Sequence, residues 1–287
     1  MTPASEASGL AETNDVSANN YHVRAILRAF EVLEQVRQAA DGIGLKELGE
    51  RTGLTKATTL RMVRNLEHVG MVEAVPGTNN YRLGVRCVEL GQAYLEHADF
   101  RYEARPILER LRDEFGETVH LGVLDDGLRV VYLDKLGGRH AVGIMMSRVG
   151  GTAPAYCTGL GKALLAVQGP DVVARLDAAG ERTAYTPSTI TGSEELEQEF
   201  ADIRERGYAL DLEEHEPGVR CVATTIPGLE EPVSVAISVA GPAHRLSEAA
   251  LTGELAPAVQ AAAVEIGQRL GVPVTDGRGG AHATRGA

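Results

Sequence analysis

Hydrophobic residues recur at helical spacing in two short runs between residues 44 and 69, separated by a break at Thr52-Gly53. The first run has Leu45 and Leu48 on one side and ends at a glycine, which can take the left-handed conformation that closes a helix. Thr55 then offers a hydroxyl that can cap the next helix. The pattern predicts two helices joined by a tight turn, the helix-turn-helix unit. The second helix should bury Thr59, Met62, Val63, Leu66 and Val69.

The face opposite this buried stripe is basic. Arginine on such a face can read guanine in the major groove of B-DNA, and small apolar groups can contact the methyl group of thymine. Leu60 is predicted to be exposed, which suits a helix that lies against DNA better than one in water. An ordinary helical hairpin inside a core is the alternative. The candidate DNA contacts of this helix are Lys56, Thr58, Leu60, Arg61 and Arg64.

A short β-hairpin is predicted directly after the second helix. Residues 71–75 and 81–83 alternate as strands do, and residues 76–80 between them, Pro-Gly-Thr-Asn-Asn, are rich in turn formers. A hairpin in this position is typical of a wing, whose tip contacts the DNA backbone or the minor groove. Asn80 and Arg82 are the candidate contacts of the wing.

Beyond the wing, strands are interrupted by helices. Ile26, Phe30 and Leu33 mark a helix that should pack under the helix-turn-helix. Hydrophobic spacing predicts helices over 22–39, 85–97, 100–115, 159–167, 194–206 and 255–270. Strands are expected over 120–124, 128–134, 141–146, 208–211, 219–226 and 232–239. This order is typical of an α+β fold with helices packed on a sheet.

The chain is long enough for two domains. We interpret residues 21–84 as a winged helix-turn-helix domain, 85–98 as a linker helix and 99–272 as a second domain, with disordered tails at 1–20 and 273–287. The formal charge is −12 overall, but it is +2 for residues 21–84. Such a protein would bind DNA through one end only. Its non-specific affinity should be weak, because that affinity comes from phosphate neutralisation.

Cysteine usage and hydropathy indicate the compartment. Cys87, Cys157 and Cys221 are far apart and form no C-x-x-C motif, which fits a reducing cytoplasm. No segment is apolar enough to span a membrane, and the first twenty residues lack the basic and apolar regions of a signal peptide. We therefore expect a cytoplasmic protein without a membrane partner.

Two further segments complete a resemblance to a family. They are residues 154–166, Pro-Ala-Tyr-Cys-Thr-Gly-Leu-Gly-Lys-Ala-Leu-Leu-Ala, and residues 218–223, Gly-Val-Arg-Cys-Val-Ala. Together with the winged helix-turn-helix and the linking helix, they resemble the IclR family of bacterial transcription regulators. The resemblance covers about residues 22–272. Its most specific part is the first segment followed by Asp211 and the second segment, in this order and spacing.

The resemblance implies a GAF-like effector-binding domain and a dimer, or a dimer of dimers, on a roughly palindromic operator. Members of the family sense small organic molecules, often carboxylates, and repress or activate neighbouring genes. By position, the effector pocket would contain Met145, Met146, Gly159, Leu160, Asp211, Cys221, Ser238 and Ala240, with the two methionines as a lid. Physical chemistry favours this independently, because the glycine-rich start of a helix offers free N–H groups to an anion.

Two positions depart from the family pattern. Ala240 stands where some members have a serine, so one polar contact to a ligand would be missing. Leu60 stands where a tyrosine is common, so the operator preference would differ.

Other interpretations of individual residues remain open. The run that ends in Gly161-Lys162 resembles a phosphate-binding loop, but Tyr156 stands where that motif needs glycine and Ala163 where it needs serine or threonine. We therefore expect no nucleotide or other cofactor. His215 among three glutamates resembles a metal cluster, although such acids on a loop are usually solvated, and no metal is expected. Asp211 could also be a cap at a strand end.

The leading hypothesis is a sequence-specific DNA-binding regulator, not an enzyme, whose operator affinity changes when a small organic effector, expected to be a carboxylate, binds the second domain. One alternative is a small-molecule enzyme that uses Cys157 or Cys221 as a nucleophile with His120 as a base. Another is a regulator that senses metals or redox state through the same cysteines. A free cysteine is, however, most often a small buried hydrophobic residue.

Overall fold

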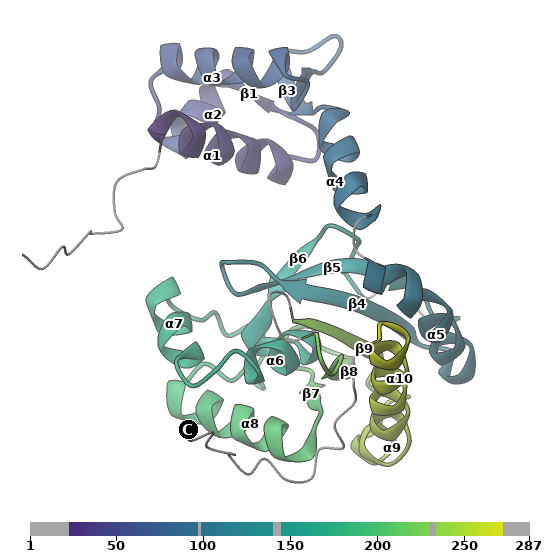
Figure 1. The fold of residues 1–287 in the computed structure, drawn as a ribbon. Coiled ribbons are helices and arrows are strands. Elements are labelled where there is room, and N and C mark those ends of the chain that lie inside the picture. The colour runs from purple at the N-terminus through teal and green to yellow at the C-terminus, as the bar shows by residue number, and fades with distance from the viewer. Residues whose placement is uncertain (1–22, 97–98, 140–144, 230–233, 272–287) are drawn as a thin grey trace, which may run out of the picture. The chain divides into compact units, whose positions relative to one another are not determined.

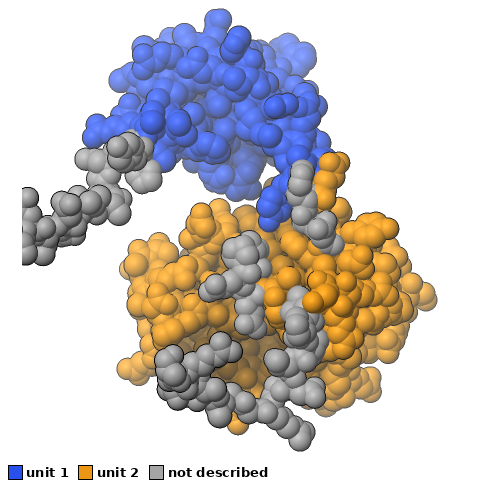
Figure 2. All heavy atoms as spheres, viewed as in Figure 1, with its two compact units in different colours: residues 1–94 blue, residues 95–287 orange. Residues whose placement is uncertain are grey.

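The computed structural model describes residues 23–96, 99–139, 145–229 and 234–271. The chain divides into two compact units, residues 1–94 and residues 95–287, which Figure 2 shows in different colours. Helices and antiparallel sheets occur in both units, so the predicted α+β fold class is confirmed. The predicted tails, 1–20 and 273–287, lie outside the described residues.

The first unit is a winged helix-turn-helix (Figure 1). Its helices are α1 (Arg24–Gln38), α2 (Leu45–Thr52) and α3 (Lys56–His68). Its sheet has the order β1-β3-β2 and consists of β1 (Ile43–Gly44), β2 (Val72–Ala74) and β3 (Asn80–Leu83). Of these elements only β1 was not predicted. The three helices and the sheet share one hydrophobic core, formed by Val32, Leu33, Val36, Ile43, Leu48, Met62, Val63, Leu66 and Val72.

The turn between α2 and α3 has the predicted chemistry. Gly53 has a left-handed φ of 65° and donates its N–H to the carbonyl oxygen of Gly49. Thr55 caps α3, since its hydroxyl oxygen accepts the N–H of Thr58 at 3.3 Å. The predicted buried stripe is confirmed at four positions, but Val69 is 55% exposed. The reason is that α3 ends at His68, so Val69 leaves the helical stripe.

The first half of α1 is not packed as the sequence predicts. Leu33 is buried, but Ile26 is 55% exposed and Phe30 is 63% exposed. The buried residues of the helix, Val32, Leu33 and Val36, all lie in its second half, and Ala29 packs against the core only partly buried. An apolar face therefore remains exposed on α1, which we call the α1 face and which consists of Val23, Ile26, Leu27 and Phe30.

The second unit is built on a six-stranded antiparallel sheet of order β6-β5-β4-β9-β8-β7. The strands are β4 (Thr118–Leu124), β5 (Arg129–Leu136), β6 (Thr152–Pro154), β7 (Ala209–Leu212), β8 (Val219–Thr225) and β9 (Val235–Pro242). One face is covered by α5 (Asp99–Phe115) and α10 (Ala256–Arg269), and the other by α6 (Gly159–Ala166), α7 (Val172–Ala179) and α8 (Ser193–Arg206) (Figure 1). The remaining elements are α4 (Arg86–Glu96), a 3-10 turn η1 (Ala155–Cys157), α9 (Glu248–Ala250) and a π-helical turn η2 (Leu251–Leu255).

Most predicted elements of this unit are present within a few residues. The helix α7 and the strand β6 were not predicted. Of the strand expected over 141–146, residues 141–144 lie outside the described residues, and Met145 and Met146 are in a loop.

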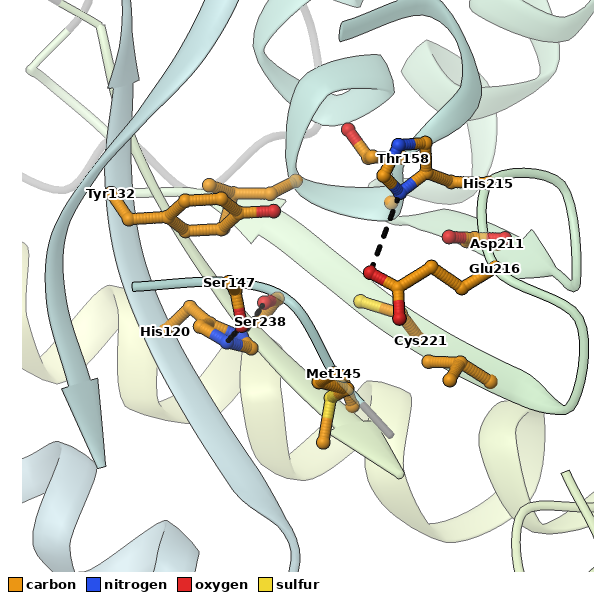
Figure 3. A pocket seen from close by; sticks show the side chains of 14 residues that line it. His120, Tyr132, Met145, Ser147, Thr158, Asp211, His215, Glu216, Cys221 and Ser238 are labelled. Atoms are coloured by element: carbon orange, nitrogen blue, oxygen red, sulfur yellow. Dashed lines mark hydrogen bonds and ion pairs between the residues drawn. The ribbon is translucent and has the colours of Figure 1, made fainter. Parts of the chain in front are cut away.

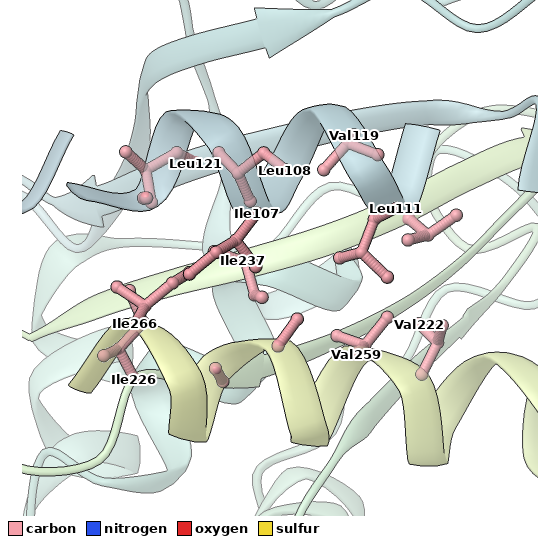
Figure 4. Packing of buried hydrophobic residues seen from close by; sticks show 14 of the residues in the cluster. Ile107, Leu108, Leu111, Val119, Leu121, Val222, Ile226, Ile237, Val259 and Ile266 are labelled. Carbon is pink, nitrogen blue, oxygen red and sulfur yellow. The ribbon is translucent and has the colours of Figure 1, made fainter. Parts of the chain in front are cut away.

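The sheet separates two hydrophobic cores. On one side, Ile107 and Leu108 of α5 and Val259 and Ile266 of α10 pack against strand residues such as Ile237 (Figure 4). Successive side chains of a strand point to opposite faces. Each central strand therefore gives alternate residues to this core and the intervening ones to the face that α6 covers.

Packing around α6 yields a stability prediction. A β-carbon on Gly161 would lie 2.3 Å from the α-carbon of Ala155 and 2.4 Å from its carbonyl oxygen. Because backbone atoms cannot move aside, Gly161→Ala should lower the free energy of unfolding by about 1–3 kcal/mol. Gly91→Ala in α4 is the matched control, since its β-carbon would have nothing within 4 Å; we expect a gain of about 0.5–1 kcal/mol. Urea denaturation measures both changes, and a neutral Gly161→Ala variant would contradict this packing.

Candidate functional site

Three basic side chains on the exposed face of α3 have no partner in the part of the chain that the structure describes. Lys56, Arg61 and Arg64 take part in no salt bridge or side-chain hydrogen bond with any described residue. Elsewhere in the same unit, Arg37 pairs with Glu34 and Arg51 with Glu47, each about one helical turn away. The cations of α3 are therefore available to phosphates or bases.

The two uncharged candidates on α3 are partly covered. Leu60 is half-buried, not fully exposed as predicted, because it borders the buried stripe of α3 that contains Thr59 and Val63. The Thr58 hydroxyl lies 3.0 Å from that of Thr55 and so belongs to the helix cap. Both residues still border the exposed face, and their contact with DNA stays a prediction.

The two wing candidates lie in strand β3, not at the tip of the hairpin. Arg82 is directly opposite Glu73 and pairs with its Oε1 at 2.7 Å. Both partners are well exposed, and such pairs contribute only about 0–1 kcal/mol, so Arg82 can exchange this partner for a phosphate. Asn80 is half-buried, and its side-chain N–H donates to the carbonyl oxygen of Gly42 at 3.5 Å.

The second unit contains a pocket at the N-terminal end of α6 (Figure 3). Its empty volume, including the open mouth, is about 420 Å³. Seven of the residues expected to bind an effector line it: Met145, Gly159, Leu160, Asp211, Cys221, Ser238 and Ala240. Contact of these residues with an effector stays a prediction. Met146 does not line the pocket; its side chain is 85% exposed, and its N–H donates to Glu216 at 3.4 Å.

The strand register brings these residues together from distant parts of the sequence. Asp211 of β7 lies opposite Cys221 of β8, and Cys221 lies opposite Ala240 of β9. Ser238 of β9 lies opposite His120 of β4. The side chains of this face are mostly small, which leaves room for the pocket and lets α6 approach.

The pocket also contains residues that the sequence did not reveal as effector contacts. These are His120, Tyr132, Ser147, Thr158, His215, Glu216 and Val219. The strand alternation that places Ser238 on this face applies equally to His120 and Tyr132, and could have identified them. Ser147, His215 and Glu216 lie on loops, where no periodic signal shows which way a side chain points.

His120, the candidate base of the enzyme hypothesis, forms one wall of the pocket. Its Nε2 lies 2.9 Å from the hydroxyl oxygen of Ser147, and its Nδ1 lies 3.4 Å from that of Ser238. Burial lowers the pKa of His120 to about 3, and the charge of Lys135 contributes in the same direction. The ring is therefore neutral near pH 7. It provides one hydrogen-bond donor and one acceptor.

Two family models match the chain over most of its length. The IclR helix-turn-helix domain matches residues 25–76, and the C-terminal domain of the bacterial transcriptional regulator IclR matches residues 92–268. The chain belongs to the IclR family. IclR-family proteins are transcriptional regulators and not enzymes, and they join a DNA-binding helix-turn-helix to a C-terminal ligand-binding domain.

Similar proteins align with nearly the whole chain. The HTH-type transcriptional regulator XynR of Escherichia coli is 33% identical over 88% of this chain and 98% of its own length. The transcriptional repressor IclR of E. coli is 30% identical over 84% of this chain and 88% of its own length. Among solved structures, an IclR homologue from Microbacterium hydrocarbonoxydans in complex with 4-hydroxybenzoate has a TM-score of 0.71 and 27% identity, and covers 86% of this chain and 98% of its own.

Loop residues 213–216 of this IclR-family protein are held by a buried ion pair. The ammonium of Lys162, which is 2% exposed, lies 2.5 Å from Glu214 Oε1 and 3.0 Å from Glu199 Oε1. The carbonyl oxygen of Glu214 also accepts the hydroxyl of Thr189 at 2.6 Å. Together these bonds hold the loop at the mouth of the pocket and present His215 to it.

Both cysteines beside the pocket are poor nucleophiles. Burial raises the pKa of the Cys221 thiol to about 12 and raises the pKa of Cys157 as well. The thiolate is the reactive and metal-binding form, so these environments disfavour both the redox and the metal hypothesis. Within the described ranges, no group of three or more His, Cys, Asp or Glu residues is placed to hold a metal ion. None of the described helices is long and apolar enough to cross a bilayer.

Asp211 is the most perturbed acid of the pocket. It is 5% exposed, and its Oδ1 accepts the N–H of Glu214 at 2.8 Å. Burial raises the pKa of Asp211 to about 7, and the charges of Glu214 and Glu216 add to this effect, whereas the Glu214 N–H and Lys162 oppose it.

This pKa predicts a pH-dependent stability. A carboxyl group whose pKa is raised on folding binds more protons in the folded state, so stability falls as pH rises from about 4 to about 7. Asp211→Asn removes the charge and keeps an oxygen for the Glu214 N–H. The variant should be more stable than the wild type at pH 8, and this gap should narrow by about 2 kcal/mol at pH 5. Urea denaturation at both pH values measures the gap.

The exposed acid Asp126 provides the control for this experiment. The stability difference between Asp126→Asn and the wild type should show no comparable change between pH 5 and pH 8. A gap for Asp211→Asn that is the same at pH 5 and pH 8 would show that Asp211 keeps an ordinary pKa.

Proposed function

We propose that this chain is a sequence-specific transcriptional regulator whose affinity for an operator changes when a small organic effector, most often a carboxylate, binds the pocket of the second unit. Repression is the favoured mode, because the E. coli relative named as a transcriptional repressor is similar over 84% of this chain. Since such a regulator works on the bacterial chromosome, we expect it in the cytoplasm. The observation that carries the proposal is the unpartnered basic face of α3 in a winged helix-turn-helix.

The DNA contacts follow from the geometry of α3 and the wing. Arg61 and Lys56 are exposed, unpaired within the described residues and on the side of α3 away from the core. They would read bases or hold phosphates in the major groove, where a recognition helix lies. Arg82 would leave Glu73 to bind the backbone beside the wing.

The effector class follows from the pocket. Its position at the start of α6 suits an anion, because N–H groups of a first helical turn and the helix dipole both favour negative charge. A carboxylate is also supported by the IclR homologue from Microbacterium hydrocarbonoxydans, which is solved in complex with 4-hydroxybenzoate. An effector changes DNA affinity only as far as it binds the free and DNA-bound states differently, typically by about 1–3 kcal/mol.

Self-association is supported by exposed apolar side chains. The α1 face lies in the same unit as Val85, Val88, Leu90 and Tyr94, which are 50–66% exposed. Large exposed apolar patches usually mark an interface. To bind two half-sites, a two-fold dimer would need its two recognition helices about 34 Å apart, one turn of B-DNA. Dimers could pair further into a tetramer.

The DNA interface is tested by Arg61→Ala. The variant should bind the operator more weakly by about 1–3 kcal/mol, because a bidentate arginine–guanine contact is lost. Titration against the DNA upstream of its own gene, with competitor DNA present, measures the change. Arg37→Ala is the matched control, since Arg37 is an arginine of the same unit that pairs with Glu34. Equal weakening by both variants would argue against Arg61 as a reader.

The dimer interface is tested by Phe30→Glu. A charge on the α1 face should shift the sedimentation of the protein toward the monomer and raise the dissociation constant of the dimer at least about tenfold, because burying an unpaired charge costs several kcal/mol. Val69→Glu is the control, since Val69 is similarly exposed but lies at the end of α3. An unchanged dimer in Phe30→Glu would exclude this face as the interface.

A further inference from the structure

The lining of the pocket that is proposed to receive an anion contains no lysine or arginine among the described residues. Its ionisable residues are the acids Asp211 and Glu216, the histidines His120 and His215, and the weak acids of Tyr132 and Cys221. Burial lowers the pKa of both histidines, so both rings are neutral near pH 7. Within the described part of the lining, an anion would meet two acids and no cation.

The nearest ammonium groups are engaged elsewhere. Lys162 is bound between Glu214 and Glu199, so two carboxylates offset its charge. Lys135 donates to the carbonyl oxygen of Ser147 at 2.6 Å and is not part of the pocket lining. Neither lysine can provide a direct partner for a ligand without breaking these bonds.

One oxygen of Asp211 is left for a ligand. Its Oδ1 accepts the N–H of Glu214, and no other hydrogen bond or ion pair joins Asp211 to a described residue. Its side chain is almost fully buried and lines the pocket, on the same side as Glu216 in Figure 3. The carboxyl group of Asp211 therefore has one oxygen, Oδ2, that can form a hydrogen bond with a ligand atom in the pocket.

The N-terminal end of α6, which favours an anion, lies against Asp211. A β-carbon on Gly159, the first residue of α6, would be 3.6 Å from the β-carbon of Asp211. The N–H of Gly161 is already taken by the Thr158 hydroxyl, so an anion would lie near the very start of α6, beside Asp211. Two carboxylates within hydrogen-bond distance cannot both stay ionised, and they share one proton.

We propose that a carboxylate effector binds this pocket together with one proton, which Asp211 holds and donates through Oδ2 to the effector carboxylate. The inference rests on the proposed carboxylate effector. It adds a hydrogen-bond donor for the effector carboxylate, namely the protonated Asp211. It makes Asp211 a specificity-determining residue, which selects a ligand oxygen able to accept a hydrogen bond. The ionisable groups around Asp211 are Glu214, His215 and Glu216 of the adjacent loop, Lys162 of α6, Cys157 of η1, Cys221 of β8 and Tyr132 of β5.

The test is calorimetric titration of the full chain with acetate, succinate, benzoate and 4-hydroxybenzoate. Each is measured at pH 6 and pH 8.5 in buffers of different ionisation enthalpy, which gives the number of protons taken up. Free Asp211 is already protonated at pH 6 because burial raises its pKa to about 7. We therefore expect uptake near zero at pH 6 and near one proton at pH 8.5, with affinity falling about tenfold per pH unit above pH 7.

Three single variants identify the group that holds the proton. Asp211→Asn, which carries a permanent donor, should bind carboxylates with no proton uptake and with affinity independent of pH. Glu216→Gln and His215→Gln should keep the uptake of one proton at pH 8.5, whatever their affinity. Uptake that survives in Asp211→Asn and disappears in His215→Gln would overturn the proposal in favour of an imidazolium.

The same titration separates failure of this inference from failure of the proposed function. Carboxylates that bind the wild type at pH 8.5 without proton uptake would overturn the inference and leave the carboxylate effector standing. If none of the four binds at either pH while the protein still binds its operator, the carboxylate class fails and the inference fails with it.

Discussion

The ion pair of the buried Lys162 ammonium is the interaction on which the pocket of the second unit depends. It joins α6, which begins at the pocket, to Glu214 in the loop after β7 and to Glu199 of α8. Removing one partner of a buried ion pair typically costs about 3–5 kcal/mol, because the other charge is left buried and unpaired. The loop that carries His215 and Glu216 is thus held by the Lys162 ammonium, which does not line the pocket. The charge of Lys162 is offset by Glu214 and Glu199 inside the protein. Asp211 and Glu216 remain as the carboxylic acids of the pocket lining.

The sequence predicted the first unit well because its signals are local. A glycine at 53 and a threonine at 55 mark a helix end and a helix cap through bonds to residues three or four positions away. The errors at Val69, at Leu60 and on α1 concern where a helix meets its surroundings. Ile26 and Phe30 follow the helical period correctly, but the period does not show whether the core or another surface covers them.

The pocket was predictable in part, and for two different reasons. The alternation of β9 separates Ser238 and Ala240 from Ile237 and Val239, and the resemblance to the IclR family implied that the first pair would face a ligand. Nothing periodic distinguishes Ser147 or Glu216, which reach the pocket because two loops fold over it. The sequence also suggested an anion site from the glycines at the start of α6, but it could not show that Asp211 would lie against the same helix end. That juxtaposition comes from the pairing of β7 with β8.

The alternation along β9 has a consequence for how such a protein changes over evolutionary time. Val235, Ile237 and Val239 belong to the core under α5 and α10, whereas Ala236 and Ala240 belong to the opposite face. A mutation at position 238 or 240 therefore alters the chemistry of the pocket while the residues that hold the sheet to its helices stay the same. Adjacent residues of β9 can therefore change independently, because one holds the sheet to its helices and the next lines the pocket. A duplicated gene could in this way come to bind a different small molecule while its protein keeps the same fold.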